Sequence, residues 1–354
     1  MRFAHLIAVG FIAVAPTFAN AAELRVASWN IANLASGPGV ALRGQTRTEQ
    51  DYARMAEHVR LLRPDIMALQ EIGSLPGARR VLGEGWRIVF ETRCMTNAQK
   101  CEADSNDIYT AIAYREEIAD RVSVFQVETL AIDHTDECGN TRPIRGGVGV
   151  KLDIGGQPSW VLSVHMKATC KDDNIEPGTE DDCATQRKQY EALKTWIQGR
   201  PSGDAIILAG DFNRRLLTAK DSIRRDIFDS LQAKVQFLPE AESRTCWRSH
   251  KFDFKALQEE ARKNNPAFDK QGLTPRIYTP AENFGIDFFV VINAGPQMRL
   301  ASDQIETDGF YRFEKPGETI VACDGSILAS GKEALTFGQA FPSDHCPILL
   351  SVSY

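Results

Sequence analysis

The sequence has no excess of positive charge, no Cys-x-x-Cys pair and no repeat or low-complexity run. Proteins that bind polyanions through non-specific phosphate contacts are usually basic, but this chain has 41 Lys and Arg against 47 Asp and Glu. Any contact with nucleic acid must therefore be local and helped by a metal, or the substrate must be smaller. The missing Cys-x-x-Cys pairs argue against a zinc cluster. Without a linker or a repeat, one domain is the simplest organisation.

Long apolar runs are also missing, except at the start of the chain. Residues 1–22 carry Arg2, the apolar stretch Leu6–Val14 and a small-x-small site at Ala19–Ala21, a pattern typical of a signal peptide. No later stretch is apolar over the roughly eighteen residues that a membrane span needs. We therefore expect residues 23–354 to form a single domain that is exported to the periplasm or the medium, without stable membrane insertion.

Eight cysteines are present, and an even number in an exported chain predicts disulfides. Two pairings are local: Cys94 with Cys101, and Cys170 with Cys183. Each closes a polar loop rich in Asp, Asn and Lys. The acidic interior of the second loop either repels polyanions, holds a structural calcium ion or is a solvated insertion. The sequence does not pair the others, which are Cys138, Cys246, Cys323 and Cys346.

The most informative stretch is an apolar run, Ala205–Ala209, followed directly by Gly210-Asp-Phe-Asn. The run is short enough to predict a buried strand. Residues two apart on an extended backbone point the same way, so Asp211 and Asn213 can converge on one target. A carboxylate beside a neutral amide suits an anionic substrate, because the amide donates a hydrogen bond without adding repulsion. An ordinary strand-ending turn would contain the same residue types.

Apolar stretches along the rest of the chain predict many strands and a few helices. The helix after Thr48 has a capping pattern and an apolar face, and Pro64 ends it. Further helices are expected at Gln186–Ile197 and near Asp221–Leu231. Strands are expected at Leu24–Asn30, Asp65–Glu71, Trp86–Glu91, Ile108–Tyr114, Val122–Glu128, Gly147–Leu152, Trp160–His165, Gly285–Ile292 and Pro347–Val352. This mixture predicts two sheets packed face to face and flanked by helices.

Polar residues recur where these strands end or are interrupted. A lone Glu there is usually a solvated edge residue, and a lone His is usually a satisfied core residue. Their repetition instead indicates a catalytic site mounted on the rim of a two-sheet scaffold. The residues concerned are Asn30, Glu71, His165, Asp211, Asn213, Asp287, Asp344 and His345.

In sequence order, these blocks resemble the signatures of the endonuclease/exonuclease/phosphatase superfamily, which includes the deoxyribonuclease I-like enzymes. The blocks are Ser28-Trp-Asn, Leu69-Gln-Glu, Val164-His, Gly210-Asp-Phe-Asn, Ile286-Asp and Ser343-Asp-His. The resemblance spans Leu24 to Tyr354 and implies an α/β fold, the four-layer α/β/β/α sandwich of two mixed sheets flanked by helices.

The resemblance also implies roles. Glu71 would bind the metal, usually Mg²⁺ with Mn²⁺ as a substitute, and Asp344 and Asn30 would support it. A single carboxylate with amide neighbours suits such a hard cation. Asp211 would position or deprotonate the attacking water, and Asn213 would bind the phosphate.

The two histidines complete the implied machinery. Asp287 would orient His345 and raise its pKa. A His at position 165 is typical of the deoxyribonuclease I-like branch, where it pairs with a Glu at the end of an earlier strand. Glu91 fits that place, and the pair would serve as a general acid. Arg142 resembles a substrate-contacting Arg, and an exposed loop Arg is the alternative.

The leading hypothesis is therefore an exported, monomeric, Mg²⁺-dependent phosphodiesterase that acts as an endonuclease on DNA. The adjacent Arg214 and Arg215 either contact the nucleic-acid backbone or are solvated, and His58 and His134 are interpreted as surface residues. A sphingomyelinase-type phosphodiesterase or a phosphatase is the alternative, since the segment Phe237–Arg276 is long enough to contain a lipid-facing hairpin. A binding domain without catalysis would require the loss of catalytic groups, and none of the blocks shows one.

Overall fold

The computed structural model describes residues 22–43, 45–105, 107–136, 139–170, 182–218, 221–240, 263, 285–304, 319–321, 327–330, 345 and 347–354. The predicted signal peptide, apart from residue 22, lies outside them. So do Asp344, the interior of the Cys170–Cys183 loop, most of the segment 237–276, and Cys138, Cys246, Cys323 and Cys346.

Two six-stranded mixed sheets form the centre of the structure. The first sheet has the order β15 (Arg299–Gln304), β18 (Ile348–Ser353), β1 (Glu23–Leu34), β4 (Ile66–Ile72), β6 (Tyr109–Arg115) and β5 (Trp86–Phe90). The second sheet has the order β13 (Val235–Leu238), β14 (Asp287–Ile292), β12 (Ala205–Asp211), β11 (Gln157–His165), β10 (Gly147–Ile154) and β7 (Ser123–Val127).

Three small two-stranded sheets lie outside this centre. They are β2 (Ala41–Leu42) with β3 (Gln45–Thr46), β8 (Asp133–Thr135) with β9 (Thr141–Pro143), and β16 (Thr319–Val321) with β17 (Ile327–Ser330). The described helices are α1 (Glu49–Leu62), α2 (Leu75–Leu82), α3 (Thr92–Thr96), α4 (Asp182–Gln198), the 3₁₀ turns η1 (Glu116–Arg121) and η2 (Glu128–Leu130), and the π-helix η3 (Arg224–Phe228).

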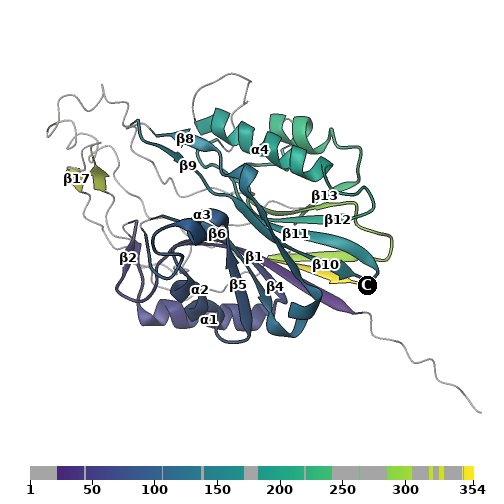
Figure 1. Ribbon diagram of the computed structural model, residues 1–354, viewed down its shortest axis with the longest axis horizontal. Coiled ribbons are helices and arrows are strands. Elements are labelled where there is room, and N and C mark those ends of the chain that lie inside the picture. Colours follow the sequence, from purple (N-terminus) through teal and green to yellow (C-terminus); the bar gives the residue numbers. More distant parts are fainter. Residues whose placement is uncertain are drawn as a thin grey trace, which may run out of the picture.

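Three apolar clusters hold four layers together, with α1 and α2 on one side and α4 on the other (Figure 1). The cluster between the sheets contains Val26 and Ile207, whereas Trp29 packs under α1 and Leu208 under α4. Alternation along each strand produces this division, because successive side chains point to opposite faces. The predicted sandwich of two mixed sheets flanked by helices is confirmed.

Helix α1 shows how local sequence builds the outer layer. Thr48 accepts a hydrogen bond from the Asp51 N–H and Asp51 reaches back, which completes the expected capping box. His58 on this helix is buried beside Trp29, with ring centroids 6.1 Å apart, so its prediction as a surface residue was wrong. In the sequence His58 follows Glu57 and lies two residues before Arg60, but the helical period turns it toward the sheet.

The pairing of strands sets the position of the polar residues. Strands β11 and β12 run parallel with His165 opposite Asp211, and antiparallel pairing of β12 with β14 puts Asp287 opposite Asp211. A side chain at Gly210 would collide with the carbonyl oxygen of Val164, so glycine permits this close approach. Three polar residues from three neighbouring strands therefore meet at one edge of the second sheet.

The expected strands all occur, with ends that shift by a few residues, but some elements were not predicted. Strands β13 and β15 and helix α2 had no place in the sequence interpretation, and the helix expected near 221–231 is largely a short π-helix. Both predicted disulfides are present, Cys94–Cys101 and Cys170–Cys183, with Cα atoms 5.3 and 5.2 Å apart.

Among the described residues, no helix has the length and apolar character needed to cross a membrane.

Candidate active site

Asn30 lies where the two sheets meet. It is fully buried at the end of the regular pairing of β1 with β4. Its Nδ2 donates to Asp211 Oδ2 at 3.0 Å and to Glu71 Oε1 at 3.3 Å. One amide thus joins a carboxylate of the first sheet to a carboxylate of the second, and both keep free lone pairs for a further ligand.

Glu71 reaches the site because its backbone is left-handed, with φ at 60°. Strand alternation after Leu69 would direct it toward the helix-covered face. The pairing of β4 shifts register on both sides at this point, and such bulges re-aim side chains beside active sites. Its carboxylate accepts from Asn30 and from the Asn33 N–H at 3.0 Å. A left-handed, non-glycine residue is strained backbone, which concentrates at functional sites.

Asp211 is the central carboxylate of the cluster. Its Oδ1 accepts from the Asn213 N–H at 2.8 Å and its Oδ2 from Asn30. Burial, more than the neighbouring Asp287, raises its pKa from 3.8 to about 7, although His345 and both hydrogen bonds oppose the shift. A carboxylate that titrates near neutrality can accept and return a proton at the pH where most enzymes work.

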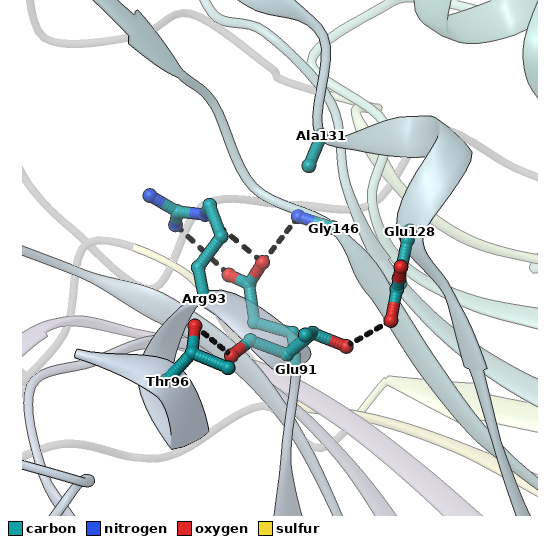
Figure 2. A pocket seen from close by; sticks show the side chains of 8 residues that line it. Glu91, Arg93, Thr96, Glu128, Ala131 and Gly146 are labelled. Atoms are coloured by element: carbon teal, nitrogen blue, oxygen red, sulfur yellow. Dashed lines mark hydrogen bonds and ion pairs between the residues drawn. The ribbon is translucent and has the colours of Figure 1, made fainter.

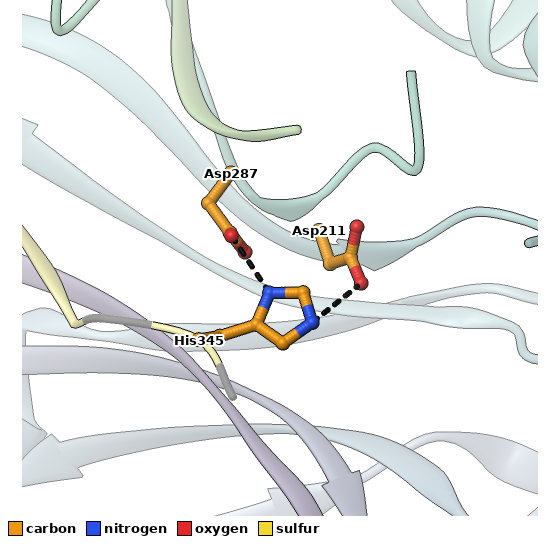
Figure 3. A group of neighbouring side chains, drawn as sticks. All are labelled: Asp211, Asp287 and His345. Carbon is orange, nitrogen blue, oxygen red and sulfur yellow. Dashed lines mark hydrogen bonds and ion pairs between the residues drawn. The ribbon is translucent and has the colours of Figure 1, made fainter. Parts of the chain in front are cut away.

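His345 is oriented by Asp287, as expected. Its Nδ1 lies 2.7 Å from Asp287 Oδ2, and its Nε2 lies 3.8 Å from Asp211 Oδ2 (Figure 3). The Trp29 indole N–H donates to the backbone oxygen of His345 at 3.1 Å, which ties this residue to the first sheet. The Asp287 carboxylate fixes the orientation of the ring, so that Nε2 faces Asp211.

His165 lies against the same cluster but without the partner that was predicted. Its Nε2 is 3.6 Å from Asp211 Oδ2 and 3.8 Å from Glu71 Oε1. Burial, reinforced by the charge of Arg145, lowers the pKa of His165 well below 6.5. Its buried Nδ1 has no hydrogen-bond partner among the described residues. His165 is therefore a neutral imidazole.

The expected pairing of Glu91 with His165 does not occur. Glu91 is buried, and Arg93 binds its carboxylate, with Nη2 2.9 Å from Oε1. The backbone N–H of Gly146 also donates to it (Figure 2), and so does the backbone N–H of Thr110. Arg93 follows Glu91 by two residues and carries a fixed positive charge. It therefore binds the carboxylate that was predicted to pair with His165.

Arg145 was missed by the sequence interpretation, which selected Arg142. Burial of the Arg145 guanidinium lowers its pKa to about 10, although the charge of Glu71 raises it. It donates to the Met166 backbone oxygen at 2.9 Å, next to His165. Arg142 is 52% exposed and lies 3.5 Å from Asp107. Of the two, Arg145 is the cation beside the carboxylate cluster.

Asn213, the last residue of the Gly-Asp-Phe-Asn block, and Arg214, which follows it, contact different parts of the chain. Asn213 has left-handed backbone, with φ at 49°, and its Nδ2 donates to the Met166 oxygen at 3.0 Å. Arg214 is buried, pairs with Asp221 at 2.7 Å and donates to the Cys170 oxygen at 2.6 Å. The prediction of Arg214 as a nucleic-acid contact or a solvated residue was wrong, because it connects this block to the disulfide.

The donor set fits a hard divalent cation. Ligand atoms of Asp211, Asp287 and His345 lie within 4.8 Å of one another, and Asn30 brings the Glu71 carboxylate to the same cluster. Carboxylate and amide oxygens are the ligands that Mg²⁺ and Mn²⁺ prefer. Glu71, with 20% of its side chain exposed, would hold the ion at the open side. Asp344, the other predicted ligand, lies outside the described residues.

Comparisons with known proteins concern the family and the fold of this chain. The profile of the Endonuclease/Exonuclease/phosphatase family matches residues 27–345. A humanised TDP2 from D. rerio aligns over 94% of this chain and 99% of its own, with a TM-score of 0.51 and 16% identity. No curated protein sequence matches significantly.

Two further solved structures are similar at lower scores. An endonuclease/exonuclease/phosphatase from Bacteroides vulgatus covers 94% of this chain and 99% of its own at 13% identity, with a TM-score of 0.48. The human nocturnin catalytic domain, solved with a bound sulfate anion, covers 94% of each chain at 16% identity, with a TM-score of 0.45. Because the family profile extends over nearly the whole sequence, the chain belongs to the endonuclease/exonuclease/phosphatase family.

Proposed function

We propose that this chain is an exported, Mg²⁺-dependent phosphodiesterase of the deoxyribonuclease I-like branch, which cleaves DNA as a single-domain monomer. Enzymes of the family hydrolyse phosphoester bonds. The observation that carries the proposal is the meeting of one buried carboxylate, Asp211, with two imidazoles, His165 at 3.6 Å and His345 at 3.8 Å. A general base beside two nitrogen donors is suited to water attack on a phosphodiester.

The chain's own groups divide the work of an in-line attack. Asp211 takes a proton from the water, and the raised pKa of about 7 makes the carboxylate a stronger base than an ordinary Asp. The Asp287–His345 pair donates an N–H toward a phosphoryl oxygen and carries positive charge as the transition state forms. A bound Mg²⁺ would neutralise charge that develops on the phosphoryl oxygens. Glu71 would hold that ion, and Asn30 would support it by fixing the Glu71 and Asp211 carboxylates through its Nδ2.

His165 has a different role from the predicted general acid. Because burial lowers its pKa well below 6.5 and no carboxylate binds Nδ1 among the described residues, it remains neutral. A neutral imidazole donates one N–H and accepts at its other nitrogen. We assign His165 to binding a phosphoryl oxygen beside Asp211, and the lost pairing with Glu91 removes the support for proton delivery.

Positive charge supports a polyanionic substrate at this rim, despite a net charge of −6 for the chain. Arg145 interacts electrostatically with Glu71 and with His165. A lipid substrate would need a contiguous apolar surface. Large apolar side chains that are exposed among the described residues lie on different elements, at Val40, Leu61, Met95 and Val124. The charge of Arg145 supports an anionic substrate such as nucleic acid, and the segment considered for a lipid-facing hairpin lies mostly outside the described residues.

The decisive experiment is nicking of supercoiled plasmid by the purified mature chain with Mg²⁺. We expect nicking that chelation stops and that Asp211→Asn slows by about 10²- to 10⁴-fold. Asp204→Asn is the matched control. Asp204 is a buried carboxylate directly before the first residue of β12, whereas Asp211 is the last residue of that strand. Asp204 accepts a hydrogen bond from the Trp160 indole at 2.7 Å. Failure to nick with Mg²⁺, Mn²⁺ or Ca²⁺ would overturn the proposal. Hydrolysis of sphingomyelin vesicles with intact plasmid would replace it by the sphingomyelinase-type alternative.

A further inference from the structure

Arg47 is a buried guanidinium, 2% exposed, that the proposed chemistry does not use. It lies between β3 and the cap of α1. Its Nη2 donates to the backbone oxygens of Ile31 and Ala32, each at 2.6 Å, and its Nη1 to that of Asn33 at 3.0 Å. One side chain therefore binds three consecutive carbonyl groups at the end of β1.

Those carbonyls belong to a strained segment. Ala32 and Asn33 have left-handed backbone, with φ at 49° and 57°. Alanine gains no side-chain hydrogen bond that would offset the cost, and such residues persist only where the surroundings fix them. The planar fork of Arg47 can bind several carbonyl oxygens at once, which a flexible single ammonium cannot do with the same geometry.

The same segment holds both first-sheet groups of the site. The Ala32 N–H donates to Asn30 Oδ1 at 2.9 Å, and the Asn33 N–H donates to Glu71 Oε2 at 3.0 Å. The left-handed turn directs these two N–H groups toward the site while its carbonyl groups face Arg47. Loss of the fork would release the turn, and Asn30 and Glu71 would lose one fixed donor each.

We propose that Arg47 is a positioning residue that sets the divalent-metal affinity of the site through the Ala32–Asn33 turn. This inference rests on the proposed function for the identity of the ligand, but not on the nature of the substrate. Groups that orient metal ligands without touching the metal typically contribute about 10- to 100-fold to affinity. Arg47 would act on these groups indirectly, through the backbone N–H donors of the turn. We therefore expect its effect on metal affinity to be near the tenfold end of that range.

The test measures Mn²⁺ binding by calorimetry in the absence of substrate. We expect about tenfold weaker binding for Arg47→Met and a smaller loss for Arg47→Lys. Arg25→Met is the matched control: Arg25 lies near the start of β1, at the end opposite the Ala32–Asn33 turn, and donates to the Leu62 oxygen at 2.8 and 3.2 Å. It should lose stability and keep wild-type Mn²⁺ affinity. Equal affinity in folded Arg47 variants and wild type would overturn the inference.

A second pair of variants keeps the test valid if the Arg47 variants do not fold. Asn33→Gly and Asn33→Ala both remove the side chain and keep the N–H, but only glycine accepts left-handed backbone without cost. Mn²⁺ affinity should fall in the Ala variant relative to the Gly variant, and equal affinities would contradict a role for the turn. Failure of plasmid nicking with intact, Arg47-dependent Mn²⁺ binding would reject the proposed substrate and leave this inference standing.

Discussion

The two sheets contribute to the site in different ways. The first sheet supplies Asn30 and Glu71 where strand pairing is broken, and Glu71 itself has left-handed backbone. The second sheet supplies His165, Asp211 and Asp287 from regular, neighbouring strands in direct register. One half therefore depends on irregular backbone to aim its groups, and the other depends on ordinary pairing.

The difference extends to protonation. In the second sheet, burial shifts the pKa of Asp211 upward and that of His165 downward, so both favour their neutral forms. The first-sheet groups are held by an amide and by backbone N–H donors, which fix geometry. We infer that substitutions in the second sheet change proton transfer, whereas those in the first change the binding of the metal.

The largest effect is expected from Asp211→Asn in the second sheet. The variant keeps the shape of the side chain and removes the base, so turnover should fall by about 10²- to 10⁴-fold. Its Mn²⁺ affinity should change as well, because the same carboxylate belongs to the cluster. Initial rates at saturating metal separate the two effects, with Asp204→Asn as the control. A rate within tenfold of wild type would remove Asp211 as the base.

The wild-type pH profile provides a separate test of the same half. The base form of Asp211 is lost as pH falls through its raised pKa, which is about 7 before a metal binds. Turnover should therefore decline on acidification, and a bound cation should move the midpoint to lower pH because it favours the charged carboxylate. Profiles at several Mg²⁺ concentrations would reveal this shift. A midpoint independent of metal concentration would contradict contact between Asp211 and the ion.

Glu71→Gln tests the first sheet. Unlike Asp211→Asn, it should change the metal requirement more than the rate at saturating metal. We expect the Mg²⁺ concentration for half-maximal rate to rise about 10- to 100-fold, with a smaller change in the rate at saturation. Glu128→Gln is the control, since Glu128 is an exposed carboxylate that binds only Thr92 among the contacts described for it, at 2.9 Å. An unchanged metal titration would exclude Glu71 as a ligand.

Two disulfides lie among the described residues, which permits a direct comparison. By chain entropy, paired Cys→Ser substitutions should cost about 3 kcal/mol for Cys170–Cys183 and about 2.5 kcal/mol for Cys94–Cys101. Only the first should also reduce turnover, because Arg214 links the Cys170 oxygen to the backbone beside Asn213. Denaturant unfolding and plasmid nicking measure the two effects. Equal turnover in both double variants would show that this link has no influence on the site.

The smallest expected effect at neutral pH concerns His58 beneath α1. Burial lowers its pKa from 6.5 to about 4, so the folded chain prefers the neutral ring and loses stability as pH falls from 6.5 toward 4. The loss at pH 4 amounts to about 3 kcal/mol, at 1.36 kcal/mol for each unit. His58→Gln should flatten this part of the stability curve without affecting nicking at pH 7.5. If the stability of His58→Gln fell between pH 6.5 and 4 as much as that of wild type, His58 would not be the group responsible for the loss.

Sequence patterns predicted the strands well because buried strands require apolar runs, as at Ala205–Ala209, and because capping at Thr48 is a local effect. The order of polar residues at the strand ends indicated which side chains meet, and Asp211, Asp287 and His345 do so. Strand β15 was missed because its charged and polar residues, Arg299 to Gln304, give no apolar signal.

The errors concern side-chain contacts that depend on tertiary packing, and residues with unusual backbone. Glu91 ended a strand as expected, but nothing in strand periodicity shows that Arg93 folds back onto it. In the sequence, Arg47 and Arg145 look like ordinary loop cations, whereas packing of the turns buries Arg47 fully and Arg145 partly. A signal existed for Arg145: it precedes the strand that starts at Gly147 and runs antiparallel to β11, which carries His165.

The last strand of the first sheet has a consequence for how the chain becomes competent. His345 lies three residues before β18, which inserts between β1 and β15, whereas its partner Asp287 was placed in the second sheet much earlier along the chain. The strands of the second sheet pair with one another and not with β18. Until that strand is in place, Asp287 lacks its imidazole. Assembly of the Asp287–His345 pair therefore requires the two sheets to come together with β18 paired to β1.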